Sequence, residues 1–187
     1  MSQLIALIIA IALGAIVTAI GYVFLGDAFT SNSERGVALQ LVNQGSQIEM
    51  AMTASRAVNA ASAADVVDFS AGTADEHYDD LTEVLVAGGF LKDVPVSPIV
   101  DTNGDSVDYT LFEDVDGTTS KSTVYAVVDS ADVSANVCQE VEELAGRSSA
   151  PATANTATDA IASLKTSNSR FGCFDSTAGY LSIYKVE

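Results

Sequence analysis

The hydrophobic pattern separates an uncharged beginning from a mixed remainder. Residues Met1 to Gly26 contain no charged side chain, and the apolar run Leu4–Leu25 is broken only by Gly14, Thr18 and Gly21. A helix of this length reaches roughly 30 Å, about the thickness of the hydrocarbon core of a bilayer. We expect such a surface to lie in lipid or to be buried against copies of itself.

A second helical pattern follows between Ser33 and Ala60, where apolar positions recur mostly at spacings of four and seven. This spacing indicates a helix with one apolar face. Cap-forming side chains between Gly26 and Ser33 allow a bend or a break between the two halves. We predict a helical stalk of about 55 residues whose second half packs on the rest of the chain. The apolar positions are Val37, Leu41, Ile48, Ala51 and Met52.

The remaining residues carry strand and helix signals that predict an α+β head. The predicted fold is a long N-terminal helix, apolar in its first half, packed on an antiparallel sheet. We divide the chain into an apolar helix (1–27), an amphipathic helix (28–60) and a head (61–187). The head is expected to contain a loop (60–75), a helix from Asp75 to Gly88–Gly89, a strand hairpin (107–112 and 123–128), a helix (133–144) ended by Gly146, a polar surface loop (148–158) and two final strands (170–175 and 180–186).

Charge narrows the classes of function. The chain has 25 acidic and 8 basic residues, a formal net charge of −17, so it would repel phosphate backbones and is not expected to bind nucleic acid. The sequence has one histidine, His77, and no serine-hydrolase or phosphate-loop motif. We therefore predict no catalytic residues, no enzyme activity and no small-molecule substrate.

The sequence has two cysteines, Cys138 and Cys173, an even count, and they lie in a mostly acidic domain that we expect to be exported. We predict that they form a disulfide. Closing a loop of this size would restrict the unfolded chain by roughly 3–4 kcal/mol. The alternative is a pair of buried free thiols.

One acidic segment places oxygen-bearing side chains around a glycine, at Asp101, Asn103, Asp105 and Asp108. Hard oxygen ligands in such a turn suit calcium. Glu113 lies one position too late for an EF-hand. The alternative interpretation is an acidic turn held by side-chain hydrogen bonds to the backbone.

The apolar helix, the amphipathic half and the cysteine placement together resemble a type IV pilin of the type IVb branch. The resemblance rests on the first residues, Met1-Ser2-Gln3-Leu4, on Gly14, and on the placement of the two cysteines. One cysteine lies in a predicted helix (VCQEVEEL) and the other near the final strands (FGCFD). The likeness extends over residues 1–60 and is topological over the head. It implies a pilin fold and a subunit that polymerises into an extracellular filament serving adhesion, motility or uptake.

The resemblance also implies a processing history and a set of partners. Met1 would be the N-terminus left by a prepilin peptidase and a candidate for methylation. The subunit would be anchored in the inner membrane, and the pilus assembly machinery would then build the homopolymer. Where most pilins carry a glutamate at position five, this chain has Ile5, so Ser2, Gln3 or exposed carbonyls would have to satisfy the N-terminal amine.

The residues expected in the filament core are the large apolar side chains of the opening run together with Gly14. Small residues between them would allow close helix packing, and the helix is expected to loosen between Gly14 and Tyr22 in a filament. The alternatives are a periplasmic pseudopilin, a minor pilin or a monomeric single-span assembly protein. The core set is Leu4, Ile5, Leu7, Ile8, Ile11, Leu13, Gly14, Ile16, Val17, Ile20, Val23 and Phe24.

Overall fold

The structure, a computed structural model, covers the long helix and most of the head. It describes residues 2–59, 76–77, 85–101, 103–114, 123–130, 133–147, 151–177 and 179–186. Met1, the predicted loop (60–75) and most of the helix expected from Asp75 to Gly88 lie outside the described residues.

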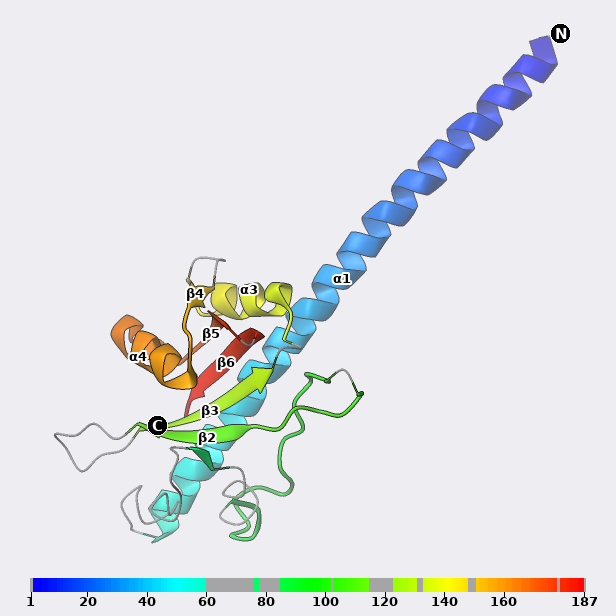
Figure 1. Cartoon of the computed structure of the whole chain (residues 1–187). Helices are drawn as coiled ribbons and strands as arrows, with labels where there is room; N and C mark the ends of the chain where they lie inside the picture. The colour runs from blue at the N-terminus through cyan, green and yellow to red at the C-terminus, as the bar shows by residue number, and fades with distance from the viewer. Residues whose placement is uncertain are drawn as a thin grey trace.

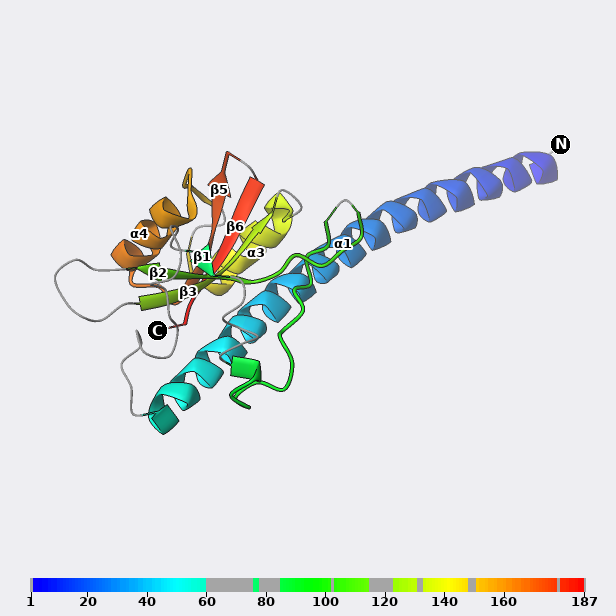
Figure 2. The same cartoon turned by 60° about the horizontal axis from the view of Figure 1, so that its bottom comes forward.

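Helix α1 (Ser2–Asn59) is one element of 58 residues and confirms the predicted stalk. It passes through residues 26–33 without a break, because the residues that could cap a helix there are followed directly by further helix-compatible sequence. Its C-terminal half lies along the head, and its N-terminal half projects beyond it (Figures 1 and 2). Within the part of the chain that the structure describes, no helix combines the length and the hydropathy needed to cross a membrane.

The described residues of the head form a six-stranded sheet in the order β1-β2-β3-β6-β5-β4. The predicted hairpin is present, because β2 pairs antiparallel with β3. The two predicted final strands are also present, as β5 and β6, and they pair antiparallel with each other. Observed β2 begins three residues later than predicted. The strands are β1 (Glu76–His77), β2 (Thr110–Asp114), β3 (Thr123–Ser130), β4 (Ala152–Thr153), β5 (Phe171–Ser176) and β6 (Gly179–Lys185).

The sheet is mixed, so the prediction of a wholly antiparallel sheet is wrong at one edge. Strand β4 pairs parallel with β5. Helix α4 (Ala157–Ser167) connects these two strands. A crossover of this kind returns the chain in the same direction, which an antiparallel hairpin cannot do. The surface loop predicted over residues 148–158 is therefore wrong where β4 and the start of α4 lie.

The predicted helix near the first cysteine is confirmed as α3 (Ala135–Leu144). The Ser134 hydroxyl accepts a hydrogen bond from the Val137 backbone N–H (3.2 Å), which satisfies an otherwise unpaired donor of the first turn. Thr156 caps α4 in the same way through the Asp159 N–H (3.2 Å).

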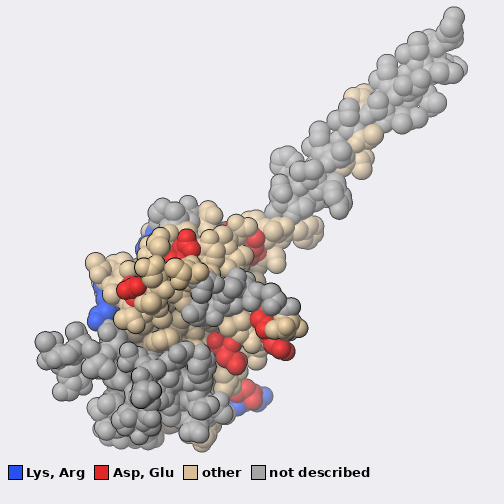
Figure 3. All heavy atoms as spheres, in the orientation of Figure 1, with Lys and Arg blue, Asp and Glu red and all other residues tan. Residues whose placement is uncertain are grey.

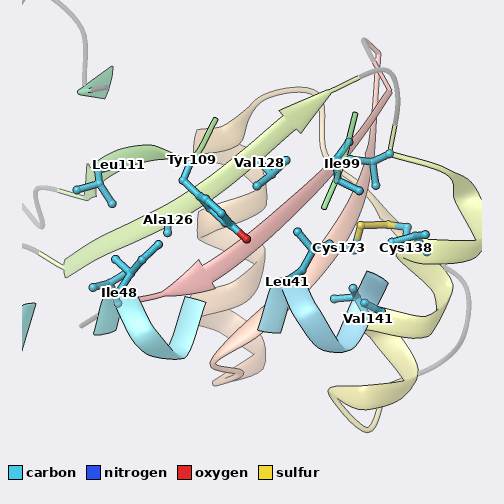
Figure 4. Close-up of a cluster of buried hydrophobic side chains, with 14 of the residues drawn as sticks. Leu41, Ile48, Ile99, Tyr109, Leu111, Ala126, Val128, Cys138, Val141 and Cys173 are labelled. Atoms are coloured by element: carbon cyan, nitrogen blue, oxygen red, sulfur yellow. A yellow bond between two sulfur atoms is a disulfide. The ribbon is translucent and has the colours of Figure 1, made fainter. Parts of the chain in front are cut away.

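Helices cover both faces of the sheet. On β3, Ala126 and Val128 face the cluster formed with α1 and α3, while Tyr125 and Val127 face the cluster formed with α4. Alternation along a strand sends successive side chains to opposite faces. Burial on both faces explains why β3 is apolar along much of its length. Figure 4 shows the α1-facing cluster between the sheet and the helix.

Candidate functional site

The face of α1 that lies on the head follows a regular spacing of three and four residues. Residues of this face are buried, which matches the seam that a helix buries against a partner surface. The predicted positions Leu41, Ile48, Ala51 and Met52 are confirmed as buried, and Val37 is partly buried. The seam consists of Ala38, Leu41, Gly45, Ile48, Met52 and Ser55.

Polar contacts fix the position of α1 along the sheet. The Tyr109 hydroxyl donates to Gln44 Oε1 (2.6 Å), and Gln44 Nε2 donates to the Val96 carbonyl oxygen (2.6 Å). Because Tyr109 is 4 % exposed, its hydroxyl depends on this partner. Sliding or rotating the helix would break both bonds.

A second polar group anchors the helix one turn further along. The Tyr184 hydroxyl donates to Glu49 Oε2 (3.0 Å), and Arg170 forms an ion pair with Glu49 Oε1. Near the head's other end, Asn136 Nδ2 donates to Glu34 Oε1 (2.8 Å). The contacts of Glu34, Gln44 and Glu49 span sixteen positions of α1, and the N-terminal half of the helix projects beyond the head (Figure 1).

Both tyrosines that bond to α1 are affected by burial. Desolvation raises the pKa of Tyr109 above its ordinary value. Desolvation, followed by the hydrogen bond and the negative charge of Glu49, raises the pKa of Tyr184. Both hydroxyls are therefore less acidic than the hydroxyl of an exposed tyrosine.

The disulfide prediction is confirmed. Cys138 of α3 is bonded to Cys173 of β5, and both residues are fully buried. The bond ties α3 to β5 of the sheet (Figure 4), and α3 also contacts α1.

The expected filament-core residues belong to the projecting half of α1. Leu13 is 58 % exposed, and Gly14 is also exposed. For the other ten core positions, the backbone is helical and the side chains lie outside the described residues. Further along the helix, Phe29, Met50 and Val58 are more than half exposed, with Leu39 at 42 %. Leu39 and Met50 are eleven residues apart and lie on one side of the helix.

The acidic turn is held by its own hydrogen bonds. Asp101 Oδ1 accepts from the backbone N–H groups of Asn103 (2.8 Å) and Asp105 (2.9 Å), and Oδ2 accepts from Asn103 Nδ2 (3.0 Å). The side-chain bond from Asn103 is the largest cause that lowers the pKa of Asp101. Among the described residues, no three His, Cys, Asp or Glu side chains come together as a metal site. Asp108 makes none of these turn contacts, and calcium binding stays a prediction.

Sequence reasoning did not identify Gln44, Gly45 and Glu49 as the residues that seat the helix. One signal was available, because a glycine inside a helix costs about 1 kcal/mol and often marks a close approach of another element. The partners of Gln44 and Glu49 are more than fifty positions away in sequence, so no local pattern indicated them.

Comparison with protein-family models, with curated proteins and with solved structures found no match to this chain.

Proposed function

We propose that this protein is the structural subunit of a type IV pilus-like filament and that it polymerises through the projecting half of α1. The observation that carries the proposal is the division of α1 into a half fixed to the head and a half that projects from it (Figure 1). The projecting half contains the uncharged run Leu4–Leu25. Apolar surface of that length is stabilised by removal from water, and sister helices can provide the cover.

Close approach of these helices is supported by composition. Small residues recur through the run, which lets helix backbones come near one another. The exposed apolar side chains on the head-bound half, Leu39 and Met50 among them, extend the surface available to neighbours.

The acidic heads would form the outer layer of the filament. Acidic side chains are spread over the visible face of the head, with few basic ones between them (Figure 3). With a net charge of −17 per chain, heads repel one another, so the attractive contribution comes from the helices.

A loosened segment would help subunits to stack. The Thr18 hydroxyl donates to the Gly14 carbonyl oxygen (2.8 Å), which gives that carbonyl a side-chain partner besides the helical backbone. Hydrogen bonds of this type often accompany helix bending. Gly14 therefore marks the segment where we expect α1 to unwind on assembly.

Electron microscopy of the purified full chain after detergent removal tests the proposal. We expect ordered fibres for the wild type and none for Leu13→Lys, because a lysine in the helical core would bury an unpaired charge at a cost of several kcal/mol. Ala162→Lys, on the exposed side of α4, is the matched control and should still form fibres.

Detergent-soluble monomers from the wild type, under conditions where the head is folded, would favour the alternative of a monomeric membrane-anchored assembly protein. Short fibres of a few subunits would favour a periplasmic pseudopilin. Fibres of equal length and number from wild type and Leu13→Lys would contradict assembly through α1.

A further inference from the structure

Two different features cover the outer edge of β5: strand β4 and a pair of charged side chains. A sheet edge presents unpaired backbone N–H and C=O groups, which another strand can pair with. Strand β4 covers this edge only at Phe174 and Asp175. The preceding stretch, Phe171 to Cys173, has no strand beside it on that side among the described residues.

An ion pair between Glu142 of α3 and Arg147, which follows the end of that helix, occupies the uncovered stretch. Glu142 Oε1 accepts a hydrogen bond from the Cys173 backbone N–H (2.7 Å), and Arg147 Nη2 donates to the Phe171 carbonyl oxygen (3.1 Å). The two side chains bind each other through Arg147 Nε and Glu142 Oε2 (2.7 Å). The pair therefore offers one acceptor and one donor to the strand, as a neighbouring strand would.

The packing around Gly172 fits this role. A Cβ atom at Gly172 would lie 3.1 Å from Arg147 Cζ and 3.1 Å from Glu142 Oε1, and closer still to Arg147 Nη2. A side chain at position 172 would therefore displace the guanidinium from the place that it occupies beside the strand.

The pair is buried at a cost. Glu142 is 4 % exposed, and Arg147 Nη1 is buried with no hydrogen-bond partner among the described residues. Removing charges from water offsets much of the attraction between them, so a buried ion pair is weak evidence for stability by itself. The hydrogen bonds of this pair with the edge of β5 indicate that the pair covers the edge.

We propose that the Glu142–Arg147 pair blocks strand addition at the edge of β5, and that the partner excluded there is the same edge of a second copy. Two such edges could pair antiparallel through residues 171–173, the part that β4 leaves open. The side chains of Glu142 and Arg147 occupy the place of a neighbouring strand, so copies of the protein associate through other surfaces. This inference does not depend on polymerisation through α1.

The test uses the full chain in detergent micelles with three variants. Glu142→Met removes the acceptor and the ion pair. Gly172→Ala keeps both charges but displaces the guanidinium from the strand. Glu143→Gln, an exposed position on the same helix, is the matched control. Hydrogen exchange at the Cys173 amide reports on the edge, and thioflavin T fluorescence with infrared amide I spectra reports on new intermolecular strands.

We expect exchange at the Cys173 amide to accelerate by about tenfold or more in Glu142→Met, since a charge-assisted bond is lost. Both test variants should show concentration-dependent thioflavin T fluorescence, while the control matches the wild type. Unchanged fluorescence in a folded Gly172→Ala variant whose Arg147 contact is lost would overturn the proposal. If Glu142→Met fails to fold, Gly172→Ala alone decides, because it deletes no charged group.

Discussion

Gly45 of α1 lies against the ring of Tyr184 of β6. A Cβ atom at Gly45 would lie 2.5 Å from Tyr184 Cδ2 and 2.7 Å from its Cβ, distances that real packing does not reach. The near end of the tyrosine cannot move without moving β6. The distance between the helix and the sheet is therefore set by the absence of a side chain at position 45.

Gly45→Ala should lower the free energy of unfolding by about 1–3 kcal/mol, because overpacking outweighs the gain in helix propensity. The matched control is Gly36→Ala, where an added Cβ meets nothing within 4 Å. That variant should be stabilised by up to about 1 kcal/mol. Urea unfolding of the full chain in detergent, followed by near-ultraviolet circular dichroism, measures both. Equal shifts in the two variants would show that the contact with Tyr184 has no energetic effect.

Alkaline pH should weaken the packing of α1 on the head. Burial raises the pKa of Tyr109, so above the ordinary tyrosine value of about 10 the unfolded chain releases this proton more readily than the folded chain. The contribution of Tyr109 to the free energy of unfolding is therefore fully present below about pH 10 and decreases as the pH rises further.

Tyr109→Phe should lose about 1–2 kcal/mol at neutral pH, because the Gln44 contact is gone, and should show a shallower decline above pH 10. Thermal unfolding at several pH values between 8 and 11 tests this. Parallel declines for the variant and the wild type would rule out Tyr109 as a source of the alkaline sensitivity.

Removing the disulfide should loosen α3 from β5. The two cysteines are 35 positions apart, and loss of the cross-link is expected to cost roughly 3–4 kcal/mol. The Cys138→Ala, Cys173→Ala double variant should therefore melt at a lower temperature, and a reductant should lower the melting temperature of the wild type alone. A reductant effect of equal size on the double variant would contradict this explanation.

Filament formation should depend on salt. Heads with a net charge of −17 repel one another, and salt screens that repulsion over a Debye length of about 10 Å at 0.1 M. We expect light scattering to show faster and more complete assembly at about 0.5 M than at about 0.01 M sodium chloride. Assembly that weakens as salt rises would mean that attraction between charged heads, and not helix burial, drives it.

The stalk and the hairpins were predictable because their signals are local. Leu41, Ile48 and Met52 repeat at helical spacing, and the apolar runs of β3 and β6 are long enough to identify strands. Helix α4 was missed because its buried face consists only of Ala160, Ile161 and Leu164, set among serine, threonine and alanine.

The contacts that position these elements were not predictable. Glu142 and Arg147 are five residues apart, a spacing that does not place two residues on one helical face. Their contacts with the edge of β5 exist only in the folded protein, so no sequence pattern indicated them. The fit of Gly45 on Tyr184 likewise joins positions that are distant in sequence. Sequence patterns indicate which faces are buried, whereas the partner of each face depends on the tertiary fold.

The most direct test of assembly through α1 is a helical reconstruction of the assembled protein by electron cryo-microscopy. We predict that the segments containing Leu4–Leu25 pack against one another along the fibre axis, with the heads outside. A reconstruction in which each of these segments is surrounded by lipid or detergent, with no neighbouring copy in contact, would contradict the account.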